Sequence, residues 1–377
     1  VGNTRIALAL SAALAPSLLA PLGLEGGGVH FRGASSTGKS TLLVAASSVW
    51  GSSSFMGSWR ATANGLEAVA AGRNDGLLVL DELGQVSGRE ACEAAYMLAN
   101  GEGKTRAGRH GEGETRRTWR TLFLSSGEIG LSEKAREANQ RLMAGQAVRV
   151  LDVPVDAGAS LGAFEALHGH DDADSFARHI KRAAGADHGH AARRFVQALA
   201  RDRDRMTTTA RQHVDAFVND HVPHGADGQV ARAVQRFGVL AAAGELATAE
   251  GVLPWPEGEA TRAAAATFQA WCDARGGAGS QEERDLLGRV RAFLDTHGGS
   301  RFQRVGKGAK PIPNRAGYLR ERNGFCEYGF TPDAFRREIC HGLDRRTVVE
   351  TLKTHGVLQP ASDGHAMQRV HTDDVLK

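Results

Sequence analysis

The stretch VHFRGASSTGKS occupies residues 29–40 and joins an apolar run to a glycine-rich turn. Residues 29–33 predict a short strand, and residues 39–50 predict a helix that ends at Gly51. Between them, residues 33–40 match the pattern G-x4-G-K-[ST]. Backbone N–H groups in such a loop, together with the positive end of the helix dipole, surround phosphate. The stretch therefore predicts a P-loop.

Two side chains of this loop have specific expected roles. Lys39 is expected to reach the β- and γ-phosphates of ATP, and the Ser40 hydroxyl is expected to ligate Mg²⁺. The residues expected to bind the nucleotide are Gly33, Ala34, Ser35, Ser36, Thr37, Gly38, Lys39, Ser40, Thr41 and Asp81.

The run LLVLDE, residues 77–82, predicts a strand that is buried on both faces and is therefore central and parallel. Such a strand presents two carboxylates at its end. Asp81 is expected to share the Mg²⁺ site with Ser40, and Glu82 to orient and deprotonate the attacking water. A kinase needs no second acid, because its substrate supplies the nucleophile, so the pair favours nucleotide hydrolysis.

A further strand, TLFLSS at residues 121–126, ends in two serines. If this strand lies beside the Asp81 strand, one serine reaches the γ-phosphate and the attacking water. We favour Ser126, and Ser125 remains an alternative.

Phosphoryl transfer in this class of protein also needs added positive charge from an arginine. Arg149, at the start of the strand predicted over residues 148–155, is the first candidate, and Arg141 is the second. Arg232 and Arg236 lie on adjacent turns of one predicted helix, from which they are expected to fold back onto the nucleotide.

The chain divides into three predicted parts. Residues 1–156 alternate strands with helices and predict an α/β core with a parallel sheet. Residues 157–278 lose the strand signal and predict a helical lid. After the glycine-rich linker at 276–280, residues 281–377 predict a winged helix, with helices at 331–341 and 344–355 and a hairpin at 357–370.

Composition limits the class of protein. The 377 residues are 41% hydrophobic and 24% charged, so a large core is expected, and the net charge of +3 means that any basic surface is local. Four scattered cysteines fit a reducing cytoplasm. The apolar run within residues 4–20, ended by Pro21, reads as a buried helix rather than a membrane span.

Two basic regions are candidates for contact with DNA. Residues 103–120, GKTRAGRHGEGETRRTWR, combine six basic residues with four glycines and predict a projecting loop or hairpin that follows a phosphate backbone. Arg345 and Arg346 begin the second helix of the predicted winged helix, where a recognition helix would meet a groove.

Several long, ordered segments resemble the bacterial family called "domain of unknown function 927" over residues 1–275. The segments are VHFRGASSTGKSTLLVAASSVWG, SWRATANGLEAVAAGRNDGLLVLDELGQ, YMLANGEGKTRAGR, WRTLFLSSGE, AGQAVRVLDVP and RFGVLAAAGELAT. That family occurs in phage and mobile-element proteins, often beside a primase-like region. It is similar to AAA+ ATPases related to replicative helicases of the minichromosome-maintenance type.

The resemblance implies a ring, expected to be a hexamer, with ATP held between subunits. It implies that Arg149 is the arginine finger of the next protomer's site, that Arg232 is a sensor-two arginine, and that Ser126 stands where the family usually has Asn. The segment 103–120 would be a pore-facing hairpin, whose Lys104, Arg106 and Arg109 contact DNA.

The function expected from these features is ATP-driven translocation on DNA, as a helicase in replication of a mobile element. Single-stranded DNA in the ring pore and a primase or other replication protein are the expected partners. Two alternatives remain: an AAA+ loader or switch that binds DNA without unwinding it, and a binding module in which the ATPase core is inert.

Overall fold

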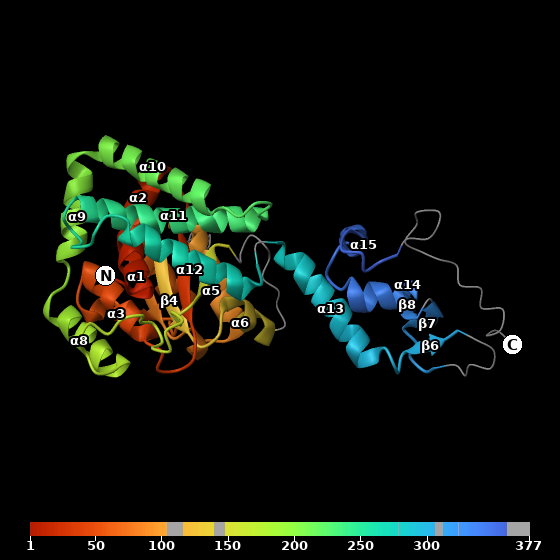
Figure 1. Ribbon diagram of the computed structural model, residues 1–377. Coiled ribbons are helices and arrows are strands. Elements are labelled where there is room, and N and C mark those ends of the chain that lie inside the picture. The colour runs from red at the N-terminus through yellow and green to blue at the C-terminus, as the bar shows by residue number, and fades with distance from the viewer. Residues whose placement is uncertain (104–115, 139–147, 278, 306–311, 323, 360–377) are drawn as a thin grey trace, which may run out of the picture. The chain divides into compact units, whose positions relative to one another are not determined.

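The computed structural model describes residues 1–103, 116–138, 148–277, 279–305, 312–322 and 324–359 (Figure 1). The chain separates into two compact units, Val1–Gly279 and Ser280–Lys377. The boundary falls within the glycine-rich segment 276–280.

A parallel five-stranded sheet forms the centre of the first unit. Its strands are β1 (Gly27–Arg32), β2 (Gly57–Ser58), β3 (Leu77–Asp81), β4 (Leu122–Gly127) and β5 (Val150–Pro154). They lie in the order β2-β3-β4-β1-β5, and every neighbouring pair is parallel. The predicted α/β class is confirmed, and all five carboxyl ends lie at one edge, where ligands of such sheets bind.

Helices cover both faces of this sheet, and successive residues of β3 show the two sides. Leu77 and Val79 belong to the core formed with α1 (Thr4–Leu14) and α3 (Lys39–Trp50). Leu78 and Leu80 belong to the core formed with α4 (Ala63–Gly72) and α5 (Gly88–Asn100). Because side chains alternate along a strand, β3 is buried on both sides, as its aliphatic run predicts.

Local capping residues explain where α4 and α5 begin and end. The Thr62 side chain accepts a hydrogen bond from the Gly65 N–H and begins α4. Ser87 and Glu90 form a reciprocal capping box at the start of α5, and Gly101 ends this helix with a left-handed φ of 74°.

The N-terminal apolar run forms two helices rather than one. α1 ends at Leu14, α2 spans Pro16–Leu22, and the two axes differ by 55°. Pro21 lies inside α2 and does not end it, because Gly23 (φ 70°) is the residue that turns the chain. Among the described residues, no single helix meets the length and hydropathy required to cross a membrane, and only this bent pair does so jointly.

A helical region follows β5 and packs onto the same unit. It contains α8 (Ala173–Ala186), α9 (His190–Arg201), α10 (Arg203–His221), α11 (Gly228–Ala249) and α12 (Glu259–Arg275). α10 and α11 run side by side, and α11 and α12 pack against α1 (Figure 1). Phe195 and Phe237 lie in one hydrophobic core with sheet residues such as Phe31. The helices therefore share their core with the sheet.

The second unit contains more strands than its sequence predicts. Its elements are α13 (Gln281–His297), β6 (Phe302–Arg304), β7 (Gly317–Arg322), β8 (Phe325–Phe330), α14 (Pro332–Ala334), a π-helical turn (Phe335–Ile339) and α15 (Arg345–Thr354). β6 pairs with β7 in parallel, and β7 pairs with β8 as an antiparallel hairpin.

The two helical segments after β8 agree with prediction. Thr331 and Asp344 act as their N-caps. The expectation of a hairpin after α15 is not met at residues 357–359, which form no strand, and residues 360–370 lie outside the described part of the chain. The hairpin that the structure does contain precedes these helices.

Candidate active site

The loop between β1 and α3 turns through two residues with left-handed backbone conformation. Ser36 and Gly38 adopt left-handed conformations, with φ of 62° and 93°. At Gly38 a side chain would also approach the Cβ of Ala163 to 3.0 Å, so glycine is required there. Left-handed conformation at a non-glycine residue is strained, and such strain concentrates at ligand-binding loops.

Lys39 is folded inward over this loop. Its Nζ donates to the carbonyls of Gly33 at 2.8 Å and Ala34 at 2.6 Å, and the residue is buried. The ammonium therefore lies within the curve of the loop, where it can exchange these carbonyls for phosphate oxygens. Ser40 follows at the start of α3, and Thr37 holds the turn by donating its hydroxyl to the Ala34 carbonyl at 2.7 Å.

Asp81, Glu82 and Ser126 form a second polar group at the same sheet edge. The Ser126 hydroxyl donates to Asp81 Oδ1. The backbone N–H of Glu82 donates to Asp81 Oδ1 at 3.0 Å and to Ser126 Oγ at 3.3 Å. Glu82 has a left-handed backbone, with φ 59° and ψ 73°, which turns the chain sharply off the strand.

One backbone hydrogen bond connects the two groups. Gly33, the first loop residue, donates its N–H to the carbonyl of Gly127 at 3.2 Å, directly after Ser126. β4 lies between β1 and β3, so Ser126 is positioned beside both the loop and the acidic pair. Of the two serines, Ser126 contacts Asp81, whereas Ser125 lies on the opposite face against His30.

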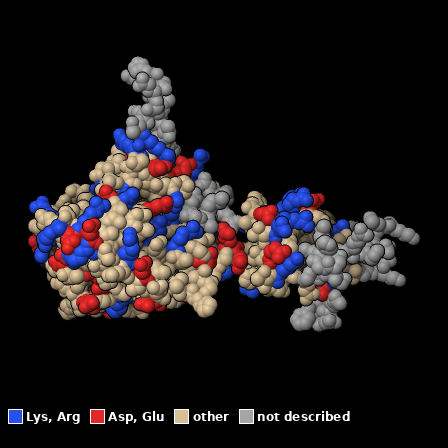
Figure 2. Space-filling model, turned by 90° about the horizontal axis from the view of Figure 1, so that it is seen from above, with Lys and Arg blue, Asp and Glu red and all other residues tan. Residues whose placement is uncertain are grey.

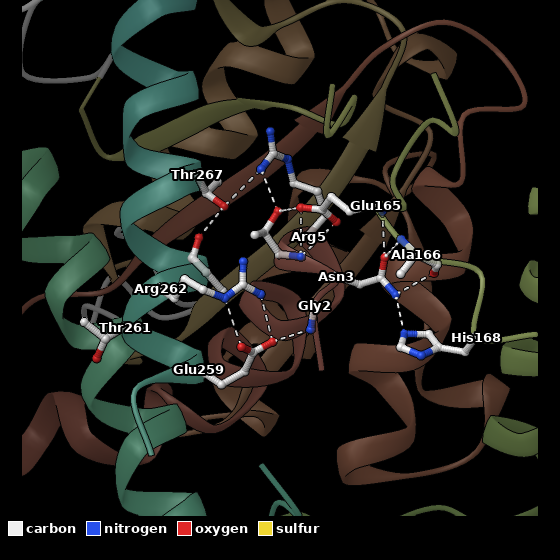
Figure 3. A network of polar contacts seen from close by, with 12 residues as sticks. Gly2, Asn3, Arg5, Glu165, Ala166, His168, Glu259, Thr261, Arg262 and Thr267 are labelled. Carbon is white, nitrogen blue, oxygen red and sulfur yellow. Dashed lines mark hydrogen bonds and ion pairs between the residues drawn. The ribbon is translucent and has the colours of Figure 1, made fainter. Parts of the chain in front are cut away.

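Residues near the N-terminus support the loop at 33–38 indirectly, through a network of polar contacts shown in Figure 3. Arg5 donates to the carbonyls of Pro154 at 2.9 Å and Asp156 at 3.0 Å, and Asn3 Oδ1 accepts from the Glu165 and Ala166 N–H groups. These contacts hold the segment after β5, whose Ala163 N–H donates to the Thr37 carbonyl at 2.9 Å. This network was not predicted, because its only signal in the sequence is a lone arginine in an apolar helix.

Arg5 is buried, and this burial lowers the pKa of its guanidinium, an effect opposed by Glu165 and Asp156. Replacing Arg5 with Met should lower the free energy of unfolding of the first unit by about 2–4 kcal/mol, because buried carbonyls lose their donor and Glu165 loses its counter-charge. Urea unfolding followed by tryptophan fluorescence measures this, since all five tryptophans lie before residue 280. Arg178→Met, in the exposed pair with Asp174, is the control and should leave the midpoint unchanged.

The arginine candidates lie at the opposite end of the strands, where β1, β4 and β5 begin. Arg149 precedes β5 and forms an ion pair with Glu25 at 3.5 Å. Arg236 donates to the Gly26 carbonyl at 3.0 Å, and desolvation together with repulsion from Arg149 and Arg232 lowers its pKa to about 10. Gly27 allows this approach, since a Cβ there would collide with the guanidinium.

Arg232 and Arg236 line a cavity of about 230 Å³ with residues that begin β1 and β4. The loop at 33–38 follows the opposite end of β1, a strand roughly 20 Å long. In the structure described, these two arginines therefore lie away from the loop of their own chain, and their role at a nucleotide stays a prediction. Arg149 also lies where the strands begin, since it directly precedes Val150, which is opposite Gly28 in β1. Arg141 lies outside the described residues.

The described residues on either side of 104–115 pair with each other as antiparallel backbone. Glu102 and Thr118 form an antiparallel bridge, and Gly103 donates its N–H to the Arg117 carbonyl at 2.9 Å. Arg116 forms an ion pair with Glu102 at 2.7 Å. Lys104, Arg106 and Arg109 lie outside the described residues. In the second unit, Arg345 and Arg346 are exposed at the start of α15.

Charge on the visible face of the first unit is mixed. Figure 2 shows lysine and arginine side chains interspersed with acidic ones, in agreement with the net charge of +3. Any strong attraction for a polyanion is therefore expected to be local.

Comparison with known proteins supports the sequence resemblance over the N-terminal part. Residues 1–118 match the family model described as "Domain of unknown function (DUF927)". The matched segment contains the glycine-rich loop at 33–40 and the Asp81–Glu82 pair. No curated protein matches the chain.

A solved structure described as "SCCmec type IV Cch - active helicase" has the same fold. The TM-score is 0.69 at 20% sequence identity, and the match covers 96% of this chain and 64% of that one. The chain thus spans about two thirds of the length of the solved protein. At this identity the likeness shows the fold alone: an α/β parallel sheet with helices, similar to that of a helicase.

Proposed function

We propose that this protein is an ATP-dependent DNA translocase, acting as a helicase in replication of a mobile element. The observation that carries the proposal is the hydrogen bond from Gly33 to Gly127, which joins the Lys39 loop to the cluster of Asp81, Glu82 and Ser126. A phosphate-binding loop beside a pair of acids is suited to hydrolysis. The similar solved structure is that of an active helicase, which agrees with this role.

The residues present fit ATP and Mg²⁺. The backbone N–H groups of the loop and the start of α3 suit a polyphosphate, and Lys39 already lies inside the curve of the loop. Ser40 and Asp81 supply the hard oxygen ligands that Mg²⁺ prefers. The metal, when bound, offsets phosphate charge. Glu82 then orients and deprotonates water, and Ser126 holds Asp81 in place.

The position of the arginines supports a ring. Arg149 and Arg232 lie where the strands begin, away from the loop of the same chain. In the proposed ring they would instead reach the nucleotide of a neighbouring copy. An AAA+ assembly, expected to be hexameric, would bring this end of the strands against the next loop. Arg149 would act as the finger and Arg232 as the sensor-two residue, both in trans.

DNA would pass through the pore against the hairpin whose base is at Glu102 and Thr118, and Lys104, Arg106 and Arg109 would contact its backbone. The second unit would act as a winged helix, with Arg345 and Arg346 on its recognition helix. The helical region would serve as the lid. A primase or other replication partner and a cytoplasmic location complete the proposal.

ATP hydrolysis with and without single-stranded DNA tests this function. We expect a severalfold stimulation by DNA, loss of turnover in Lys39→Ala, and strand displacement on a forked duplex. Stimulation without displacement would instead identify a loader or switch. Hydrolysis that Lys39→Ala leaves intact would place the activity outside this loop and refute the site.

A further inference from the structure

A chain of buried polar groups crosses the sheet on the face opposite α3. Trp59, Ser125 and His30 are each no more than 2% exposed. Trp59 Nε1 donates to Ser125 Oγ at 2.7 Å, and Ser125 Oγ lies 2.9 Å from His30 Nδ1. His30 Nε2 lies 3.0 Å from the carbonyl of Ile129. The proposed hydrolytic mechanism uses none of these groups.

For a neutral His30, the hydrogen bonds in this series of groups have only one consistent direction. An indole N–H can only donate, and a carbonyl can only accept. His30 therefore carries its proton on Nε2 and donates it to Ile129. Its Nδ1 accepts from the Ser125 hydroxyl, which itself accepts from Trp59. Asp152, Arg32 and Glu82 face the imidazole, and desolvation lowers the pKa of His30, which favours this neutral form.

Both ends of this series of hydrogen-bonded groups, Trp59 and Ile129, contact the proposed catalytic site. The Trp59 backbone N–H donates to the Asp81 carbonyl at 3.3 Å. Ile129 lies in the loop that follows Gly127, the last residue of β4, so the bond from His30 holds the backbone three residues after Ser126. At Gly127 a Cβ would lie 3.0 Å from the His30 ring, so the imidazole is also in close packing contact with this loop.

The same loop leads into α6 (Leu131–Glu137), and a side chain of β5 binds the first residue of this helix. Asp152 Oδ1 accepts from the Leu131 N–H at 3.3 Å. In the sheet, His30 of β1 lies directly opposite Ser125 of β4 on one side and Asp152 of β5 on the other. The loop after Ser126 is thus held at Ile129 by His30 and at Leu131 by Asp152.

We propose that His30 is a positioning residue for nucleotide hydrolysis, which holds the loop after β4 so that Ser126 stays on Asp81 and Glu82. The inference rests on the proposed function. Stability alone does not explain the arrangement, because apolar groups of similar shape can replace a buried hydrogen-bonded pair at little cost. The hydrogen bond from His30 to the carbonyl of Ile129 has a more specific effect, because it fixes the position of one loop.

Two substitutions test the two ring nitrogens of His30 separately. In His30→Gln the side-chain amide nitrogen is as many bonds from Cβ as Nε2 is, so the donor to Ile129 is retained and the acceptor for Ser125 is lost. In His30→Asn the amide oxygen replaces Nδ1, so the acceptor is retained and the donor to Ile129 is lost. Each variant removes one buried hydrogen bond, and their losses of stability should be similar.

We expect His30→Asn to lower kcat for ATP by about tenfold or more, as small misplacements of a reacting group do, with KM and the affinity for a fluorescent ATP analogue unchanged. His30→Gln should retain most of the wild-type kcat at a similar Tm. Equal kcat losses in both variants, a loss in neither, or a change confined to KM would overturn the proposal. If the wild type failed to hydrolyse ATP, or Lys39→Ala kept the activity, the proposed function would fail first, so the two failures are distinguishable.

Discussion

Replacement of Glu82 by Gln is expected to lower the rate of ATP hydrolysis by about 10² to 10⁴-fold, the contribution usual for a general base. The amide has the shape of the carboxylate but accepts no proton. The backbone contacts of residue 82 with Asp81 and Ser126 come from its N–H group and remain. Nucleotide affinity should therefore change little.

The expected consequence is a trapped, ATP-bound assembly. Retention of radiolabelled ATP on the protein, together with light scattering, measures this state. Glu93→Gln is the matched control, because Glu93 lies exposed on α5 in a pair with Arg89. Hydrolysis by Glu82→Gln at the wild-type rate would exclude this residue as the base.

Arg149→Ala is expected to lower turnover roughly 10³-fold, as loss of an arginine finger does, although Arg149 contacts nothing in the loop of its own subunit. In the single chain its guanidinium lies near Glu25 and over the ring of Tyr96, at the start of β5. The loss would therefore arise between copies. Arg89→Ala, which removes an exposed arginine of α5, is the control.

Mixing two inactive variants gives the decisive measurement. Arg149→Ala supplies an intact Lys39 loop, and Lys39→Ala supplies an intact Arg149. In an equal mixture roughly one interface in four carries both, so part of the activity should return. If activity stays absent after mixing, Arg149 does not act in trans and the ring proposal loses its main support.

Most elements of the first unit follow from local sequence signals. The loop at 33–38 lies between β1 and α3 as its motif predicts, and the aliphatic run at 77–80 is buried on both faces. Two features were missed. β2 has only two residues, too few for a periodic signal, and Pro21 occupies a helix that it was expected to end.

The second unit was predicted less well. Its helices begin at capping residues that the sequence displays, but the hairpin of β7 and β8 was not predicted. The dipeptide Asn323-Gly324 is a strong hairpin signal. The run before it, GYLRER, is rich in charge, and neither that run nor FCEYGF after it alternates clearly between apolar and polar residues, which hid the strands.

The chemistry proposed for the site can be recognised in the sequence, because a glycine-rich loop, a lysine and a strand ending in two acids are made of residues adjacent in the chain. Which of these groups meet depends on the folded chain. The order β2-β3-β4-β1-β5 brings Ser126 onto Asp81, directs Ser125 toward His30, and separates Arg149 and Arg232 from the loop. Strand pairing joins segments as far apart in the chain as Gly28 and Val150, and no local spacing encodes which strands become neighbours.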